Sequence, residues 1–513
     1  NYRPANVLLL LFEIRSLLLR RGDLLSEMSI YMRTSNGGAE YLRRTSSSTG
    51  CGSHRQLAYL SLLLGQVALI FASENSQPLE LPQELLEHFT PLGVLSTTIT
   101  EASKELRNDP DFGKSPRQLA ELKGYPFEGH RVVTDDGVIL TVHRIPYGRN
   151  QRSKSGIPNK DVVFLPAPLF CSSPFYIDDL ANNSIGFILA DAGFDVWLGN
   201  TRGTIYGSET ISQGRITDRR DRKFYNYTLV EHGVFDVAAQ IDYILRHTNV
   251  PKLAYFAHSQ GSASGFALLS KRPEYNSHIS AFASLGGFRT FACPINQVPP
   301  AIWRPIKLFI SGFRATSEVF DLTSMTRLCK SYWPVCQQVL STFLYGDAQH
   351  SNLTRIPLYL EHYPQPTSVK NLIYLAQLYQ RACRGDKRAV EFNYDEVLHE
   401  SADQLWFDTG LYGNNAQVYG KSAVPELPVE NIRVPVKVYY SDGDTLITPS
   451  NQRDLIAELP RVVGVYHIAD PGFVHGNFAH SPYNMSHVYY VIEFFRAYKD
   501  NNLPPKNVDS QQE

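Results

Sequence analysis

The chain has 513 residues, of which 43% are hydrophobic and 19% are charged, and its formal net charge at pH 7 is −1. A chain of this length can bury a large core, as two or three domains or as one α/β domain with an insertion. The balanced charge argues against a nucleic-acid-binding protein, which normally carries a basic excess or a basic stripe. No nucleic-acid partner is therefore expected.

The cysteines indicate neither a disulfide scaffold nor a zinc site. There are only six of them, and none forms a Cys-x-x-Cys pair or a Cys/His cluster with metal-ligand spacing. We expect no metal and no cofactor. Cys329 and Cys336 could close a short loop in an oxidising compartment or could be buried free thiols, and their spacing leaves both open. Asn-x-Ser/Thr sequons, which support secretion only weakly, lie at Asn182, Asn226, Asn352 and Asn484.

The N-terminal part differs in composition from the rest. Residues 1–53 are Leu-rich and then Ser/Gly/Arg-rich, which indicates a disordered upstream extension or else a genuine additional segment. Residues 54–73 have the layout of a signal peptide, with cleavage expected near Ala72 or Ser73. The apolar run is short for a membrane span, so a removed signal is favoured over a permanent anchor. Residues 74–123 are expected to be a linker or N-terminal region.

Two stretches, 124–289 and 431–500, show strands alternating with helices. A hairpin is predicted around Asp135-Asp136-Gly137, because β-rich arms flank this turn sequence. The other expected elements are strands at 161–170, 195–203, 253–256, 278–288, 435–444 and 462–476, and helices at 182–194, 231–248 and after Gly261. The alternation predicts an α/β fold whose mainly parallel sheet is covered on both faces, with the hairpin at its antiparallel edge.

Residues 290–430 interrupt this alternation. They are rich in proline, aromatic residues and leucine, without regular strand periodicity. We interpret them as a mostly helical insertion between two core strands, either a cap over a site or an ordinary helical subdomain. Residues 501–513 are expected to be a C-terminal tail.

Ser259 is the strongest candidate nucleophile. It lies in KLAYFAHSQGSASG, between an apolar strand and small residues that suit the start of a helix. In the α/β-hydrolase arrangement the nucleophile sits on such a strand-to-helix turn, with glycine two positions away on each side. Here the flanking residues are Ala257 and Gly261, so one position carries an extra methyl group. The alternative is an ordinary turn serine.

A catalytic serine also needs an imidazole base and a carboxylate that orients it, in the chain order Ser, acid, His. Asp444 follows the strand VPVKVYYSDG, where a parallel strand delivers side chains to a site. Asp442 is its competitor, and either could be a turn residue beside Gly443.

His475 is the candidate base, because it lies on a glycine-containing loop after the final strand. Of the other histidines, His467 falls inside a strand pattern. His480 and His487 fall near or within the last helix, where a solvated or capping role is more usual.

With these motifs in place, the chain from about Gly124 to Phe495 resembles the acid lipase family of α/β-hydrolases, which includes gastric, lingual and lysosomal lipases. The resemblance is carried by YPFEGHRVVTDDGVILTVHRIPYG, CSSPFYIDDLANNSIGFILADAGFDVWLGNTRG, AHSQG, SDGDTLITP and FVHGNF. It implies hydrolysis of acylglycerols or sterol esters by a secreted or lysosomal enzyme of the secretory pathway. It also implies a cap at 290–430, a Cys329–Cys336 disulfide, and a triad of Ser259, Asp444 and His475.

The chain departs from the family at Ala167-Pro168, where the family has His-Gly. By resemblance, the oxyanion hole is formed by the backbone N–H groups of Leu169 and Gln260. Pro168 fixes its own φ and pushes Ala167 toward an extended conformation, which can misdirect the Leu169 donor. Losing one such donor costs about 2.7 to 4 kcal/mol. The sequence therefore leaves an alternative open, a lipid-binding protein of this fold with weak or no hydrolysis.

Overall fold

The structure is a computed structural model that describes residues 109–151, 160–293, 317–322, 346, 349–395, 413–481 and 485–499. These residues belong to one compact unit of the chain. Within these ranges, no helix is both long enough and apolar enough to cross a bilayer. The predicted extension and signal peptide, the tail and the pair Cys329/Cys336 lie outside the described residues.

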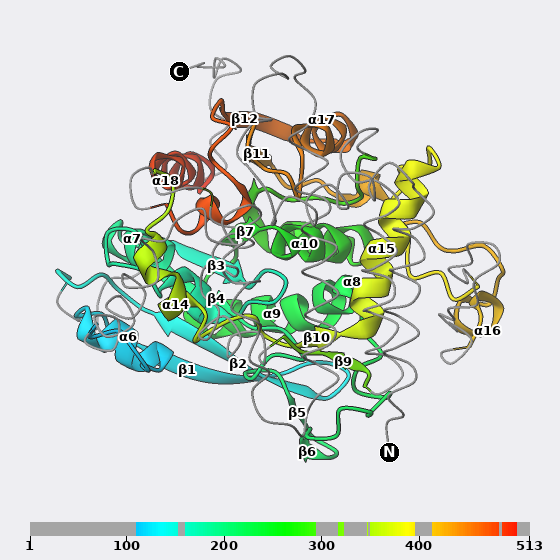
Figure 1. Ribbon diagram of the computed structural model, residues 1–513, viewed down its shortest axis with the longest axis horizontal. Helices are drawn as coiled ribbons and strands as arrows, with labels where there is room; N and C mark the ends of the chain where they lie inside the picture. Colours follow the sequence, from blue (N-terminus) through cyan, green and yellow to red (C-terminus); the bar gives the residue numbers. More distant parts are fainter. Residues whose placement is uncertain are drawn as a thin grey trace, which may run out of the picture. The chain divides into compact units, whose positions relative to one another are not determined.

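A ten-stranded sheet forms the centre of the described part, in the order β12-β11-β8-β7-β3-β4-β2-β5-β6, with β1 paired to β2 (Figure 1). Its strands are β1 (Glu128–Val133), β2 (Val138–Ile145), β3 (Val162–Pro166), β4 (Asp195–Gly199), β5 (Glu209–Thr210), β6 (Gly214–Arg215), β7 (Leu253–His258), β8 (Ile279–Leu285), β11 (Val436–Ser441) and β12 (Val462–Ile468). A separate two-stranded sheet pairs β9 (Val319–Phe320) with β10 (Thr367–Ser368).

The predicted mainly parallel sheet is confirmed. From β12 to β4, all neighbouring strands run parallel. The predicted hairpin is also confirmed, because β1 and β2 pair antiparallel and β2 forms an antiparallel edge on β4. Strand β3 ends at Pro166, earlier than the apolar run predicts, because Pro168 cannot donate to a ladder and a turn follows, in which the Cys171 N–H donates to the Pro168 carbonyl at 3.1 Å.

The helices follow the same chain order. They are α6 (Pro116–Leu122), η2 (Ser173–Tyr176), α7 (Ile185–Asp191), α8 (Leu229–Glu231), the π-helical η3 (His232–Val237), α9 (Ala238–Thr248), α10 (Gln260–Lys271), η4 (Pro273–Ser277), η6 (Leu353–Arg355), α14 (Ile356–Tyr359), α15 (Val369–Cys383), α16 (Asn415–Tyr419), η8 (Val429–Asn431), α17 (Pro449–Glu458), η9 (His475–Phe478) and α18 (Ser486–Tyr498). The helix predicted at 231–248 is therefore present, but with a π-helical segment near its start.

Both faces of the sheet are buried, as the alternation of β7 illustrates. Ala254 and Phe256 belong to a core with side chains of α7 and α18, whereas Leu253, Tyr255 and Ala257 belong to a second core with side chains of α9, α10 and α17 (Figure 1). Successive side chains of a strand point to opposite faces, so a continuous apolar strand needs cover on both. The helices supply that cover and leave the carboxyl ends of the strands to the connecting loops.

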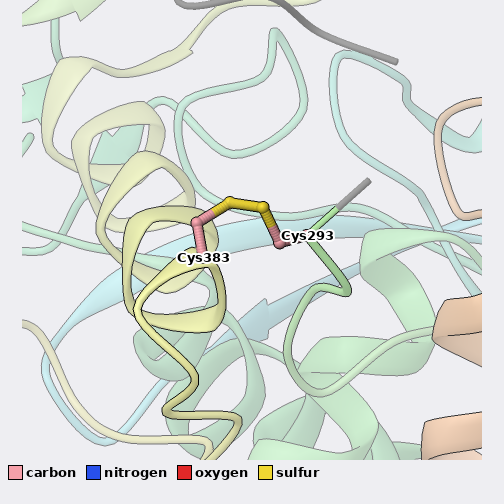
Figure 2. The surroundings of a disulfide bond; sticks show 2 residues. All are labelled: Cys293 and Cys383. Carbon is pink, nitrogen blue, oxygen red and sulfur yellow. A yellow bond between two sulfur atoms is a disulfide. The ribbon is translucent and has the colours of Figure 1, made fainter. Parts of the chain in front are cut away.

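A disulfide joins Cys293, at the start of the insertion, to Cys383, 90 residues further along the chain. Figure 2 shows Cys383 on helix α15, where it is the last residue, and Cys293 on the segment after β8. Neither spacing nor a local motif pairs these cysteines in the sequence, so this bond was not predicted.

Three buried histidines give the fold a pH dependence. Burial, as the largest cause, lowers the pKa of His143 to about 4, of His487 to about 4 and of His232 to about 3. Each histidine is harder to protonate in the folded state than in the unfolded chain, where the pKa is about 6.5. The stabilisation is thus complete above about pH 6.5 and is lost as the pH falls toward 4, at about 1.4 kcal/mol per pH unit for each histidine.

We therefore expect the melting temperature to fall between pH 7 and pH 5, and to fall less in His143→Gln, which removes one of these groups. His143 lies on β2, and its Nδ1 is 2.5 Å from the Ser173 hydroxyl, a bond that glutamine can retain. Calorimetry of both proteins at each pH measures the effect. Parallel pH curves for wild type and variant would contradict the assignment.

Candidate active site

Ser259 occupies the junction between β7 and α10. Its backbone has φ 55° and ψ −127°, a conformation that is rare for a residue with a side chain. The Ser259 N–H donates to the Leu285 carbonyl at 3.0 Å, and the Ser259 carbonyl accepts from Ser262 at 2.9 Å as helix α10 begins. The side chain is half-buried. This is the strand-to-helix turn that the sequence predicts.

The turn is tight on its downstream side. A Cβ atom on Gly261 would lie 2.9 Å from the Pro166 carbonyl oxygen at the end of β3, so glycine is required there. On the upstream side, Ala257 is fully buried in the core beneath α10, which accommodates its methyl group.

Asp444 and His475 form a buried pair. Asp444 Oδ2 lies 2.7 Å from His475 Nδ1, and Asp444 Oδ1 accepts the backbone N–H groups of Leu446 and Ile447. A carboxylate can only accept, so His475 Nδ1 carries the proton and Nε2 is left as the basic nitrogen. The Asp444 side chain is 1% exposed and that of His475 6%, so solvent hardly weakens the bond.

Contacts through β8 and β7 bring this pair beside the serine turn. Leu285 accepts the N–H of Ser259, and the next residue, Gly286, packs against the pair: a Cβ there would lie 3.2 Å from Asp444 Oδ2 and from His475 Nδ1. On the other side, His258 Nε2 is 3.0 Å from the His475 carbonyl oxygen. His258 and Gly286 were not predicted as site residues, because His258 precedes Ser259 whereas the base is expected after the acid in the chain, and because glycine supplies no reacting group.

The competing residues lie elsewhere. Asp442 Oδ1 is 2.8 Å from His467 Nε2, and both side chains are about two-fifths exposed, at 43% and 39%. The rival acid and the rival base therefore form a surface pair with each other.

His480 and His487 are buried rather than solvated. His480 Nε2 is 2.9 Å from Asp178 Oδ1, and His487 Nε2 is 2.8 Å from the Phe478 carbonyl oxygen. His487 lies on α18, on the face that packs against the sheet, which explains its burial.

Leu169 and Gln260 lie in the two segments that meet at Gly261. Leu169 is in the turn after β3, where Phe170 has φ 61°, and Gln260 is the first residue of α10. The two backbone N–H groups donate to no other group in the described part of the chain. The Gln260 side chain is held instead, because its Oε1 accepts from Asn371 at 3.0 Å and its Nε2 lies 3.3 Å from His232 Nδ1.

The insertion also touches the loop of His475. The Asn477 side-chain amide, two residues after His475, donates to the His350 carbonyl at 2.9 Å and to the Ser351 hydroxyl at 2.8 Å. Asn371, the partner of Gln260, lies on helix α15 of the same insertion. The insertion thus supports both sides of the site.

Among the described residues, the one group with metal-ligating potential is Glu128, His130 and His247, away from this site. Arg144 Nη1 lies 3.0 Å from Glu128 Oε2 and 3.3 Å from His247 Nε2. The guanidinium cation of Arg144 therefore already occupies the place that a metal ion would take.

The predicted glycosylation sites differ in exposure. Asn182 and Asn226 are exposed, Asn352 is partly buried, and Asn484 lies outside the described residues.

Comparisons with known proteins agree with this fold. A family described as "alpha/beta hydrolase fold" matches residues 178–478, and a "partial alpha/beta-hydrolase lipase region" matches residues 116–180. Human gastric triacylglycerol lipase is 30% identical over 75% of this chain and 92% of its own length. Human lipase member N is 28% identical over 71% of this chain and 86% of its own length, and human lipase member K is 28% identical over 72% and 87%.

Gly286→Ala tests whether this glycine makes room for the pair. The φ of Gly286 is +51°, where alanine costs about 1 to 2 kcal/mol, and its Cβ would also press on Asp444 and His475. We expect a lower melting temperature than in Gly214→Ala, whose glycine has φ +69° and no neighbour within 4 Å of an added Cβ. Calorimetry measures both, and equal losses would show that the contact with the pair is unimportant.

Proposed function

Because this chain belongs to the acid lipase family of α/β-hydrolases, we propose that it is a serine ester hydrolase that cleaves lipid esters, either acylglycerols or sterol esters, through an acyl-enzyme on Ser259. The observation that carries the proposal is the buried Asp444–His475 pair, held beside the strained turn of Ser259. An imidazole with one nitrogen fixed by a carboxylate and the other left basic is the group that a serine hydroxyl needs.

In the proposed reaction, His475 Nε2 takes the proton of the Ser259 hydroxyl as its oxygen attacks the acyl carbonyl. Asp444 stabilises the imidazolium that results. The imidazolium then protonates the leaving alcohol, and the acyl group stays on Ser259. Water, deprotonated by the same imidazole, attacks the acyl-enzyme; the imidazolium then returns the proton to the Ser259 oxygen as the bond to the acyl group breaks and the fatty acid leaves.

The backbone N–H groups of Leu169 and Gln260 are the proposed oxyanion donors. Gln260 is the first residue of a helix of 12 residues, so its N–H points out of the positive end of the helix dipole. Among the described residues, the Gln260 side chain bonds to Asn371 and His232 while its backbone N–H donates to no protein group, which leaves that N–H for a ligand.

The relatives support a proposal for the substrate class, and the disulfide supports one for the location. The gastric relative is named as a triacylglycerol lipase, and we propose a lipid ester at a lipid–water interface here, with the insertion of 290–430 as cap over the acyl chain. A disulfide such as Cys293–Cys383 forms in oxidising compartments. This bond supports a place in the secretory pathway, secreted or lysosomal, with a removed signal at 54–73 and glycans on sequons such as the exposed Asn182 and Asn226.

Hydrolysis of short-chain and long-chain acylglycerols and of a sterol ester tests the proposal. We expect Ser259→Ala to reduce fatty-acid release to background, and Asp444→Asn to lower kcat by about 10⁴-fold, since the imidazole then takes the wrong tautomer. The matched control is Asp442→Asn, which breaks only a surface pair and should change kcat by less than about twofold.

A fluorophosphonate reagent gives a second measurement, because only an activated serine reacts with it. We expect labelling at Ser259 in the wild type and in Asp442→Asn. If the wild type neither reacts with the reagent nor hydrolyses the esters, the proposed ester hydrolase activity is contradicted. A lipid-binding protein of this fold is then favoured.

The loop after β3 is tested by the double change Ala167→His/Pro168→Gly. If Pro168 misdirects the Leu169 donor, the change should raise kcat by about a hundredfold to a thousandfold, with KM little altered. The single change Pro168→Gly separates backbone freedom from the added imidazole. An unchanged kcat in both variants would show that the present turn already aims the donor.

A further inference from the structure

His258, the last residue of β7, joins the serine turn to the segment of the base. It directly precedes Ser259, is 3% exposed, and its Nε2 lies 3.0 Å from the backbone oxygen of His475. The two imidazole rings are also close, with centroids 4.6 Å apart and ring planes tilted by 38°. The His258 side chain therefore connects Ser259 to His475, the two residues between which the proposed reaction moves a proton.

The bonding of His258 fixes its protonation state. A carbonyl oxygen can only accept, so Nε2 carries the hydrogen and donates it. Nδ1 is buried and finds no hydrogen-bond partner among the described residues. Burial, and then the neighbouring His475, lower the pKa of His258 well below its usual value, so this imidazole stays neutral and is not itself a base.

The surroundings of His258 are apolar on its other sides. The ring stacks on Phe175 with centroids 5.7 Å apart, and Phe478 lies 5.9 Å away. A phenylalanine would fit such a place without a buried nitrogen that lacks a partner, a defect that costs about 1 to 3 kcal/mol. The histidine is therefore best explained by what its single N–H does.

The bond to Asp444 acts on the His475 ring, whereas Asn477 holds the neighbouring main chain through its bonds to Val474 and to the insertion. His475 begins the short helix η9, directly after a loop that contains Gly472. The His258 bond acts on that main chain at His475 itself. The two bonds together restrict both rotation and displacement of the imidazole.

We propose that His258 is a positioning residue that holds the backbone of His475 so that Nε2 faces the Ser259 hydroxyl. The inference rests on the proposed function, because it takes Ser259 and His475 as nucleophile and base. Misplacing a reacting group by about 1 Å can cost about a hundredfold in rate, so even a small displacement of the His475 main chain is expected to lower kcat.

His487 provides a matched control, because it bonds the same short helix, η9, from α18. It is also fully buried, its Nε2 is 2.8 Å from the Phe478 carbonyl oxygen, and its Nδ1 is unpartnered among the described residues. Both histidines thus donate one hydrogen bond to η9, but His487 holds its last residue and His258 holds the proposed base.

The experiment compares His258→Phe, His258→Gln and His487→Phe for kcat, KM and melting temperature with a soluble short-chain ester. We expect His258→Phe to lower kcat by about tenfold or more at nearly constant KM, and His258→Gln, which keeps a donor at similar reach, to recover most of the loss. His487→Phe should lower the melting temperature comparably while kcat changes little. If His258→Phe does not fold, His258→Leu replaces it.

Two results would overturn the proposal: an unchanged kcat in folded His258→Phe, or an equal loss of kcat in His487→Phe, which would indicate general loosening of η9. Failure of the proposed function is recognised separately, because Ser259→Ala would then hydrolyse as fast as the wild type. In that case, the downfield proton resonance of the His475–Asp444 bond is compared among the same variants. A shift in His258→Phe alone supports positioning, and identical spectra contradict it.

Discussion

The backbone of Ser259 is held in a conformation that costs about 1 to 3 kcal/mol, and the surrounding elements are arranged so that it cannot relax. The end of β3 lies against Gly261, the Leu285 carbonyl takes the Ser259 N–H, and α10 starts at once from the Ser259 carbonyl. These contacts belong to neighbouring strands of the parallel sheet, so the turn depends on the register of β3, β7 and β8. The register of these strands therefore sets the geometry of the site.

The same register explains why a nucleophile and an acid–base pair from distant parts of the chain come together. β11 lies next to β8, and Gly286 follows β8 directly below the Asp444–His475 pair. Parallel strands end at one edge, and the loops after β7, β8, β11 and β12 therefore share it. Two hydrogen bonds connect these loops: the Ser259 N–H donates to the Leu285 carbonyl, and His258 donates to the His475 carbonyl. Because each bond has a main-chain acceptor, substitutions elsewhere do not easily disturb it.

Much of this could be predicted from the sequence, because its signals are local. The hairpin turn at Asp135-Asp136-Gly137, the strand–helix alternation and the setting of Ser259 each depend on a few adjacent residues. Asp444 and His475 were chosen by chain order and strand ends, and the structure places them in hydrogen-bond contact; their catalytic roles stay a prediction. Features that depend on long-range contact could not be predicted from the sequence: the Cys293–Cys383 bond, the π-helical turn before α9, and the bond from His258 to His475.

The insertion is bonded to the core at both sides of the site, through Asn371 to Gln260 and through Ser351 to Asn477. It is therefore not an interchangeable module. A chimera that received this segment from a relative to alter its substrate range would also receive new partners for these two core side chains. A chimera that exchanges other parts of the insertion but keeps Ser351 and Asn371 of this chain would preserve the two contacts. Exchange of the whole segment would put them at risk.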